Sequence, residues 1–266
     1  MSMTDTTTTG VNTHDLESEV KEMYRKVAEN PLDDFHFEMG RPLAERLGYD
    51  PNDLDRIPSG SIDSFAGVGY FFKLASLRTG ERVLDLGSGS GMDTFIAALN
   101  VGPDGEVVGV DMTEAQRRKA ERLRDDAGIT NVIYIDAYIE EVPVEDESFD
   151  AVISNGVINL APDKSRVFRE AARLLKPGGR LAIADIVTDA QLPENVTRDA
   201  TLWAACIGGA AQRDDYRSAI EKAGLRIVTL QENPEYQFLS KSAKGATDTW
   251  GVKSVSLLAV KDRERA

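Results

Sequence analysis

The 266-residue chain has few of the side chains that bind metals or form disulfides. It contains one cysteine, Cys206, and two histidines, His14 and His36. A single cysteine cannot form a disulfide within the chain, and such a composition is typical of a reducing compartment, so we expect a cytoplasmic protein. Because these three residues form no Cys/His cluster in the sequence, we also predict no metal site.

Positive charge and long apolar runs are also scarce. The chain has 31 Lys and Arg against 45 Asp and Glu, which gives a net charge of -14. Because nucleic-acid-binding surfaces are basic, we expect no nucleic-acid partner. No run approaches the ~18 apolar residues of a membrane span, and the threonine-rich start lacks the apolar stretch of a signal peptide. We therefore expect no membrane span, and a disordered tail over residues 1–13.

A glycine turn between a predicted strand and a predicted helix is the most informative feature that is present. The apolar run at 82–86 suits a buried parallel strand, and residues 92–99 follow an apolar helical pattern. Between them, Gly87, Gly89 and Gly91 stand at alternate positions. Such a turn brings the backbone close to a ligand at the helix N-terminus, where free N–H groups point outward. We therefore expect a nucleotide-like cofactor at this turn.

Alternating strand and helix patterns continue to the C-terminus and predict an α/β fold with a doubly wound, seven-stranded Rossmann-like sheet. The other expected strands are 106–110, 131–135, 149–153, 180–187, 225–230 and 252–260. The expected helices between them are 113–127, 163–175, 193–206 and 213–223, with Thr113 as an N-cap and Lys-Pro-Gly-Gly at 176–179 as a helix stop. Before the sheet we expect helices at 15–29 and near 42–47, and an apolar cap over the cofactor at 61–77. This predicts an N-terminal helical cap or lid, residues 14–78, and a core, residues 79–266.

Two acidic residues lie where parallel strands end. Asp85 precedes the first glycine by two positions, and Asp111 follows the second strand about 20 residues after the turn. An acid at the position of Asp111 binds ribose hydroxyls in dinucleotide-binding folds, and its alternative role is to cap the strand end. Met112 would then pack on an adenine ring, with the adenine edge near residues 136–140. We also expect ligands to collect beside the fourth strand, at 154–160, where the strand order should reverse.

Three features together resemble the class I S-adenosylmethionine (SAM) methyltransferases: the acid-x-Gly-x-Gly-x-Gly pattern at 85–91, Asp111, and Leu-Lys-Pro-Gly-Gly at 175–179. The likeness covers roughly residues 80–190. It implies a last strand that pairs antiparallel with its neighbour, and SAM as the cofactor. The residues expected to hold SAM are Asp85, Gly87, Ser88, Gly89, Gly91, Asp93, Asp111, Met112, Ala137, Tyr138 and Asn155.

Finer motifs are similar to those of the arsenite methyltransferases. They include Ser-Asn-Gly-Val-Ile-Asn-Leu at 154–160 and Trp-Ala-Ala-Cys-Ile-Gly-Gly-Ala at 203–210. That family holds trivalent arsenic with three cysteine thiolates, because a soft metalloid suits soft sulfur. Cys206 matches one of the three, whereas Val68 and Gly156 stand at the other two positions. With two of three thiolates absent, the sequence argues against arsenite methylation.

We therefore expect an enzyme that transfers the methyl group of SAM to another small organic molecule. Val68 and Gly156 would leave an apolar, roomy acceptor pocket, and the predicted substrate-binding residues are Val68, Tyr70, Gly156, Trp203, Cys206 and His36. The predicted catalytic residues are Asn155, Glu140 and Asp185. Asp185 has an alternative role as a helix cap or hydrogen-bond anchor, and Cys206 as a buried thiol that acts as a small hydrophobe.

Other functions stay open at this point. They are arsenite methylation with a reduced thiolate set, and a SAM-binding protein without catalysis. An NAD(P) oxidoreductase is disfavoured, because the glycine spacing differs from G-x-G-x-x-G. The sequence does not fix the oligomeric state, and a homodimer is one alternative.

Overall fold

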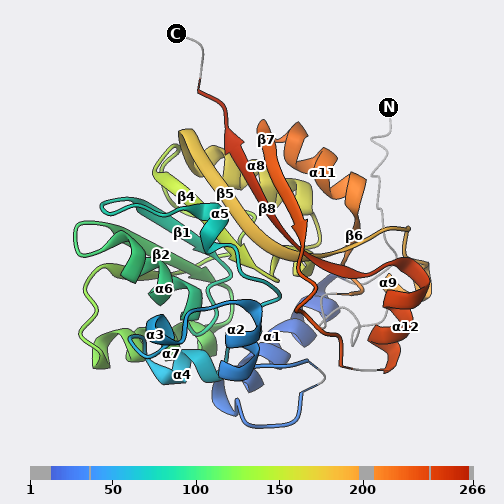
Figure 1. The fold of residues 1–266 in the computed structure, drawn as a ribbon, viewed down its shortest axis with the longest axis horizontal. Helices are drawn as coiled ribbons and strands as arrows, with labels where there is room; N and C mark the ends of the chain where they lie inside the picture. Colours follow the sequence, from blue (N-terminus) through green and yellow to red (C-terminus); the bar gives the residue numbers. More distant parts are fainter. Residues whose placement is uncertain (1–12, 36, 198–206, 240, 264–266) are drawn as a thin grey trace.

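The computed structural model describes residues 13–35, 37–197, 207–239 and 241–263, and a central mixed sheet organises them (Figure 1). The strands are β1 Arg82–Leu86, β2 Glu106–Asp111, β3 Val132–Asp136, β4 Phe149–Asn155, β5 Leu175–Thr188, β6 Ala211–Gln212, β7 Leu225–Glu232 and β8 Lys253–Lys261. Their order is β3-β2-β1-β4-β5-β8-β7, and the two-residue strand β6 pairs with β5. The predicted seven-stranded sheet is confirmed, and β6 is an addition that the sequence did not suggest.

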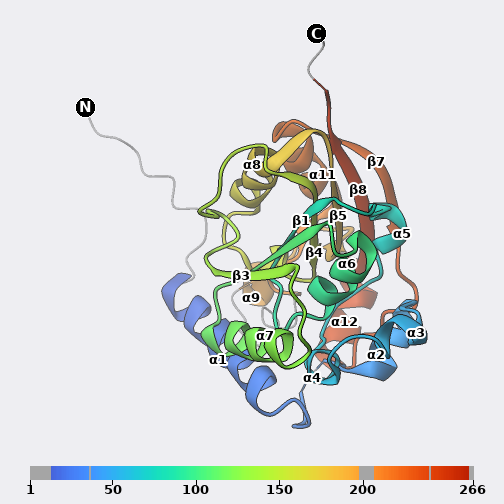
Figure 2. The same ribbon diagram turned by 90° about the vertical axis from the view of Figure 1, so that its left-hand side faces the viewer.

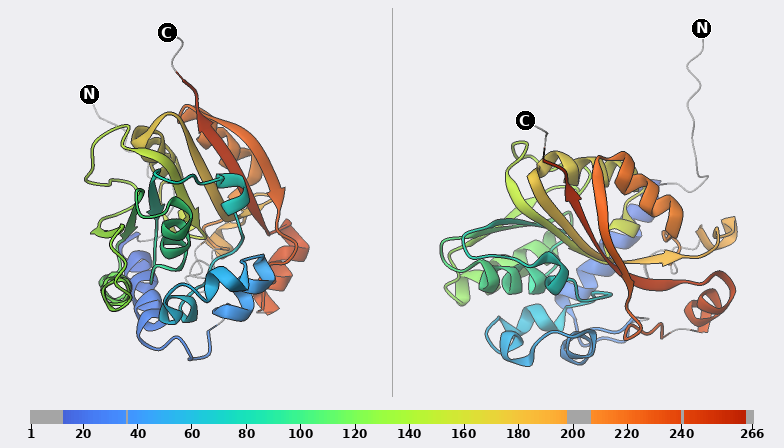
Figure 3. Two further views of the ribbon diagram at one scale, coloured as in Figure 1. Left: turned by 60° about the vertical axis from the view of Figure 1, so that its left-hand side comes forward. Right: turned by 45° about the horizontal axis from the view of Figure 1, so that its top comes forward.

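The strands β1 to β5 run parallel, and β8 lies antiparallel between β5 and β7. Figure 3 shows β7 and β8, in orange and red, side by side at one edge of the sheet. The predicted antiparallel last strand is therefore confirmed. The order places β1 and β4 side by side at the centre, where connections leave to opposite edges of the sheet. This is the switch point at which ligands bind in doubly wound sheets.

Both faces of the sheet are covered, because successive residues of a strand point to opposite faces. On β1, Val83 joins one apolar cluster while Leu84 and Leu86 join another. The helices α6 Met92–Val101 and α7 Glu114–Asp126 contribute to the first cluster. The helices α8 Lys164–Leu174 and α11 Arg213–Lys222 contribute to the second. The chain thus forms the three layers of a doubly wound α/β fold.

The N-terminal helices form the predicted cap. They are α1 Thr13–Glu29, α2 Arg41–Leu47, α3 Pro51–Leu54, α4 Ser59–Asp63 and α5 Phe72–Ala75. In Figure 2, α1 lies beside α7, with which it makes extensive contacts. Leu43 and Phe71 of the cap share one buried cluster with Val83 of the sheet. The division into a cap, 14–78, and a core, 79–266, therefore stays a prediction, since both parts bury the same apolar cluster.

The structure differs from the sequence-based expectations in several segments. Lys-Pro-Gly-Gly at 176–179 is part of β5 rather than a separate stop, although α8 does end just before it. A register shift between Phe149 and Ala151 accommodates this start of β5. Besides the expected helix near 42–47, the segment 48–77, which includes the expected cap at 61–77, contains three short helices whose positions were not predicted. A further helix, α12 Lys241–Trp250, was not predicted from its mixed polar sequence.

Some predictions fall partly outside the described residues. The expected disordered tail, 1–13, lies outside them except for Thr13, which begins α1. Of the expected helix 193–206, the structure describes α9 Glu194–Thr197 and nothing from 198 to 206. None of the described helices has the length and apolar character needed to cross a bilayer.

Candidate active site

The glycine turn after β1 has the close backbone packing that its sequence predicts. Gly87, Gly89 and Gly91 all have positive φ angles, of 75°, 53° and 95°. A Cβ on Gly87 would lie 2.4 Å from the Val157 side chain, and one on Gly91 would lie 2.3 Å from the Tyr134 hydroxyl oxygen. At Gly89, by contrast, a Cβ would meet no atom closer than 3.8 Å. Two glycines therefore let the turn pack against protein, while Gly89 faces space that protein does not fill.

That space is a cavity at the carboxyl ends of the parallel strands. Residues after β1, β2, β3 and β4 line it from the sheet, and Val20 and Tyr24 of α1 and Phe65 of the cap line it from the opposite side. The predicted cofactor residues meet here, apart from Gly91, whose two neighbours line the cavity. Those that line it are Asp85, Gly87, Ser88, Gly89, Asp93, Asp111, Met112, Ala137, Tyr138 and Asn155.

Asp111 holds the turn and the start of α7 together. One carboxylate oxygen accepts from the backbone N–H of Gly89 at 2.9 Å, and the other accepts from the N–H of Thr113 at 2.7 Å. Thr113 occupies the N-cap position of α7 as predicted, but its side chain makes no capping hydrogen bond. Burial raises the pKa of Asp111 above its usual value, and these backbone N–H groups oppose that rise. Each oxygen keeps a second lone pair for a ligand hydroxyl.

A second group of polar side chains links the cap to the turn. The Tyr49 hydroxyl donates to one oxygen of Asp93 at 2.5 Å, and Asn155 Nδ2 donates to the other at 3.0 Å. Asn155 Oδ1 accepts from the backbone N–H of Val68 at 2.8 Å. Burial raises the pKa of Asp93 to about 6, even though both hydrogen bonds lower it. Asn155 thus fixes the cap segment and the acid beside the turn at the same time.

Tyr49 was not anticipated from the sequence. It is buried, and burial together with the neighbouring Asp93 raises its pKa well above the usual value. It precedes α3 in a segment without a recognisable motif, and its partner lies 44 positions further along the chain. No local pattern in the sequence signals such a contact.

Asp85 and Ser88 complete the turn side of the cavity. The Thr94 hydroxyl donates to Asp85 at 2.6 Å, and burial followed by the charge of Asp93 raises the Asp85 pKa well above its usual value. The hydroxyl of Ser88 is buried and has no hydrogen-bond partner. A buried polar atom in a native protein usually has a hydrogen-bond partner. A bound ligand can supply the partner for the Ser88 hydroxyl.

The segment after β3 carries Tyr138 and Glu140 to the other side of the cavity. The Tyr138 hydroxyl accepts from Lys21 of α1 at 2.9 Å and donates to Glu17 at 2.6 Å. Burial raises the pKa of Glu140 above its usual value. Both Glu17 and Glu140 line the cavity, so α1 and this segment close it together.

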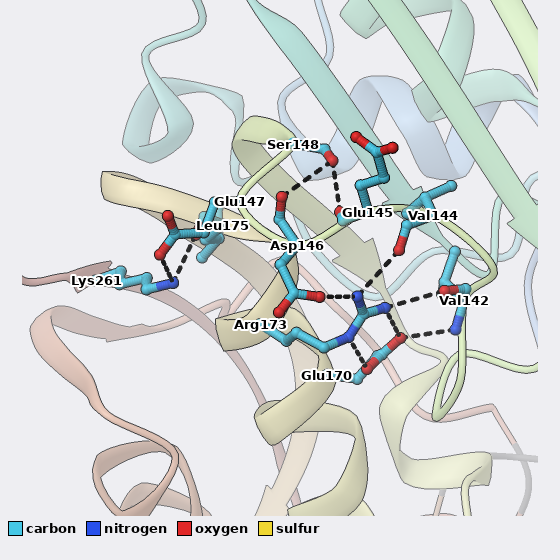
Figure 4. Close-up of polar contacts among 10 residues, drawn as sticks. All are labelled: Val142, Val144, Glu145, Asp146, Glu147, Ser148, Glu170, Arg173, Leu175 and Lys261. Carbon is cyan, nitrogen blue, oxygen red and sulfur yellow. Dashed lines mark hydrogen bonds and ion pairs between the residues drawn. The ribbon is translucent and has the colours of Figure 1, made fainter.

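Arg173 of α8 fastens the loop that follows this segment (Figure 4). Its guanidinium donates to the carbonyl oxygens of Val142 and Val144, both at 3.0 Å. It also pairs with Asp146 at 2.5 Å and with Glu170 at 2.7 Å. Arg173 was not anticipated from the sequence, because its partners come from a loop about 30 residues away.

Asp185 lies away from the cavity. Its carboxylate accepts from Asn159 Nδ2 at 2.7 Å, from the N–H of Ile186 at 2.8 Å and from the Tyr216 hydroxyl at 2.9 Å. Burial raises the Asp185 pKa to about 6. The structure therefore does not bring Asp185 together with Glu140 and Asn155, and its contacts are those of the alternative role, a hydrogen-bond anchor.

The predicted acceptor-binding residues that the structure describes lie beside the cavity rather than in its lining. Val68, Tyr70 and Gly156 are not among the residues that line the cavity, although their neighbours Ala66, Gly67, Asn155 and Val157 are. Val68 and Gly156 adjoin each other, since a Cβ on Gly156 would lie 3.3 Å from Val68 Cγ1. Trp203, Cys206 and His36 lie outside the described residues.

The fold and the site together define a SAM-dependent methyltransferase of class I. The sheet order, the glycine turn and Asp111 agree with this class, and the residues fit the cofactor. Asp111 has lone pairs for ribose hydroxyls, Ser88 has an unpartnered hydroxyl, and the space beside Gly89 is open.

Comparison with known proteins identifies the family. The family model described as "Methyltransferase domain" matches residues 77–224, and the chain belongs to this family. It is 43% identical over 192 residues to an arsenite methyltransferase of Halobacterium salinarum, which covers 72% of this chain and 49% of that protein. It is 42% identical over 159 residues to the human arsenite methyltransferase, covering 55% of this chain and 42% of that protein. The chain spans about half the length of these curated relatives.

Solved structures agree with the fold. The arsenic(III) SAM methyltransferase of Chlamydomonas reinhardtii superposes with a TM-score of 0.63 at 33% identity, covering 85% of this chain and 75% of that one. The geranyl diphosphate C-methyltransferase of Streptomyces coelicolor superposes with a TM-score of 0.68 at 17% identity, covering 92% of this chain and 97% of that one. At that identity the second likeness shows the fold alone. The chain is thus a SAM-dependent methyltransferase with an arsenite-methyltransferase-like scaffold, and its cofactor is SAM.

Proposed function

We propose that this enzyme methylates a small organic molecule that binds in the cavity beneath α1. One observation carries the proposal. The same cavity is lined by the cofactor turn on one side and by Val20, Tyr24 and Phe65 on the other. An apolar wall next to the cofactor suits an organic acceptor.

The roles of the residues follow from their contacts. The glycine turn and Asp85 would hold the amino-acid part of the cofactor, Asp111 its ribose, and Met112 its adenine. When bound, SAM supplies a methyl group on a sulfonium sulfur, which is a good leaving group. The protein then has to position the acceptor and exclude water. Asn155 fixes the cap segment through Val68, and Glu140 is the carboxylate in the cavity that we propose as the proton acceptor.

Arsenite methylation is the second candidate, because the similar proteins are named for it. The positions of the two missing thiolates, Val68 and Gly156, adjoin each other in the structure but carry no sulfur. Replacing Val68→Cys and Gly156→Cys together should create a thiol pair that binds trivalent arsenic. Gly156 has a φ of 75°, so its cysteine costs roughly 1–2 kcal/mol of stability. Titration of free thiols with arsenite, in the double variant and the unchanged protein, measures the gain.

Methyl transfer from labelled SAM separates the candidates. We expect label to enter organic acceptors and not arsenite supplied with glutathione. Methylated arsenic from the unchanged enzyme, with no transfer to any organic acceptor, would overturn the proposal. SAM binding without any transfer would instead favour a SAM-binding protein that has no catalytic activity.

We further propose a cytoplasmic enzyme without a nucleic-acid partner, supported by its single cysteine and its net charge of -14. A homodimer is proposed as the oligomeric state. Light scattering at several protein concentrations tests it, and a monomer mass throughout would refute it.

A further inference from the structure

A segment of the cap, residues 65–69, forms one wall of the cavity, and we call it the wall segment. Its first three residues line the cavity: Phe65, Ala66 and Gly67. Val68 and Gly69 complete it, and both are buried although they belong to no helix or strand. A buried backbone of this kind needs hydrogen-bond partners from elsewhere for its N–H and C=O groups. The side chains that supply these partners therefore decide where the wall stands.

Two side chains supply them. Asn155, which ends β4, accepts from the N–H groups of Val68 at 2.8 Å and of Gly69 at 3.3 Å. Its Nδ2 donates to the carbonyl oxygen of Gly69 at 3.1 Å. Ser254, near the start of β8, donates to the carbonyl oxygen of Val68 at 2.5 Å. Asn155 and Ser254 thus satisfy all four backbone polar groups of Val68 and Gly69.

Ser254 belongs to a chain of three polar side chains that leads to the wall segment. The Ser256 hydroxyl donates to Asn233 Oδ1 at 3.0 Å, and Asn233 Nδ2 donates to Ser254 Oγ at 2.9 Å. Each group in this chain donates toward the wall segment, and hydrogen bonds aligned in this way strengthen one another. Ser254 and Ser256 are both buried, so water competes little for these bonds.

The antiparallel last strand explains how the C-terminal part of the chain reaches this wall. Because β8 runs antiparallel to β5, with Ser254 opposite Ile186, its start lies at the carboxyl end of β5 (Figure 3). The strand β7 runs antiparallel to β8 and ends at the same edge, where Asn233 follows it directly. Gly69 permits the close approach. A Cβ there would lie 2.3 Å from Asn233 Nδ2 and 2.8 Å from Ala184 Cβ.

We propose that Asn233 and Ser254 are positioning residues of the acceptor site, through which β7 and β8 hold the wall segment. This inference rests on the proposed organic methyltransferase, since that function makes the wall opposite the cofactor turn an acceptor wall. Asn155 also donates to Asp93 beside the turn, so it serves both sides of the cavity. Among the described residues, no hydrogen bond of Asn233 or Ser254 reaches the turn at 87–91. They therefore act on the acceptor separately from the cofactor.

Amide hydrogen exchange, measured by mass spectrometry on the enzyme saturated with S-adenosylhomocysteine, tests this role without a known acceptor. Ser254→Ala and Asn233→Ala should each speed exchange in the peptide that spans 65–69 by about fivefold or more, because a lost hydrogen bond loosens the segment. Exchange at 87–91 should change by less than about twofold, because separate sites couple weakly. Unchanged exchange at 65–69 in both variants, or an equal increase at 87–91, overturns the inference.

Asn131→Ala is the matched control. The Asn131 amide also donates to backbone carbonyl oxygens, those of Ala98 and Gly102, but it lies before β3 at the opposite edge of the sheet. This variant should leave exchange at 65–69 unchanged. An increase there as large as in Ser254→Ala would mean that any such loss loosens the wall segment, and would refute a specific role of the C-terminal strands.

Methyl transfer from labelled SAM measures the consequence for catalysis. The probes are phenol, aniline and thiophenol, which offer oxygen, nitrogen and sulfur on one apolar ring, and arsenite with glutathione. For each probe that is methylated, kcat/KM should fall at least about fivefold in Ser254→Ala and Asn233→Ala, while KM for SAM changes by less than about twofold. A KM for SAM that rises as much as kcat/KM for the probe falls would overturn the positioning role.

The two proposals fail in different ways. If arsenite alone is methylated, the proposed organic acceptor falls, and the same comparison with arsenite decides the positioning role. If an aryl probe is methylated equally well by all variants, the proposed function stands and the positioning role falls. Transfer to none of the probes overturns both.

Discussion

Asp111 gives the sharpest test of the cofactor site, because each of its carboxylate oxygens accepts a hydrogen bond from a backbone N–H group. Asp111→Ala removes the acceptors of the Gly89 and Thr113 backbone N–H groups. Hydrogen bonds to a charged group contribute roughly 1.5–3 kcal/mol, and an unsatisfied buried donor costs about 1–3 kcal/mol. The variant also loses the lone pairs that we assign to the ribose. We therefore expect SAM affinity to fall by roughly 2–4 kcal/mol, or about 30- to 1,000-fold.

Calorimetric titration with SAM and S-adenosylhomocysteine measures this loss, and circular dichroism checks that the variant is folded. The SAM affinity of Asp111→Asn should lie between those of the unchanged protein and Asp111→Ala. The amide keeps one acceptor oxygen but turns its NH2 group toward the second backbone donor. Asp126→Ala, at the far end of α7 and exposed, is the control and should bind as the unchanged protein does. A folded Asp111→Ala variant with unchanged affinity would refute the assignment of this acid to the cofactor.

Three further outcomes follow from the buried contacts. Tyr49→Phe removes the hydroxyl that donates to Asp93. Chemical denaturation should therefore show a free energy of unfolding about 1 kcal/mol lower, and SAM should bind more weakly. Arg173→Ala should lower the free energy of unfolding by roughly 2–4 kcal/mol in the same assay, because a largely buried Glu170 loses its partner. Arg169→Ala is the control on the same helix: Arg169 is exposed and lies 3.8 Å from Asp163, so this variant should lose under about 1 kcal/mol. The Asp185 pKa rises from 3.8 to about 6 on folding, so the folded state retains a proton that the unfolded state releases. As the pH rises from about 4 to 6, the free energy of unfolding should therefore fall by up to roughly 3 kcal/mol relative to that of Asp185→Asn. Parallel profiles of unfolding free energy against pH for the two proteins would contradict this.

Local signals explain why the cofactor side of the site was predictable. The alternate glycines, the acid after β2 and the apolar run of β1 are each readable within a few residues. The parallel pairing of β1 with β2 and β4 then brings their ends together without further information. Asp111 and Asn155 meet the turn because the carboxyl ends of parallel strands share one edge.

Contacts between distant segments were not predictable in the same way. Tyr49 reaches Asp93 across 44 positions, and Arg173 fastens a loop that has no sequence motif. The helix α12 forms where the sequence is polar and contains Gly245, which disfavours a helix locally. In each case tertiary contacts, rather than the local sequence, decide the structure.

The acceptor side combines both kinds of information. Val68 and Gly156 are 88 positions apart in the sequence, yet their side-chain positions adjoin. Asn155 holds the Val68 backbone by a 2.8 Å hydrogen bond, so the backbone that would present two thiolates is kept in place without them. The side chains at Val68 and Gly156 therefore determine whether these adjoining positions offer thiols, while the cofactor turn is built from other residues.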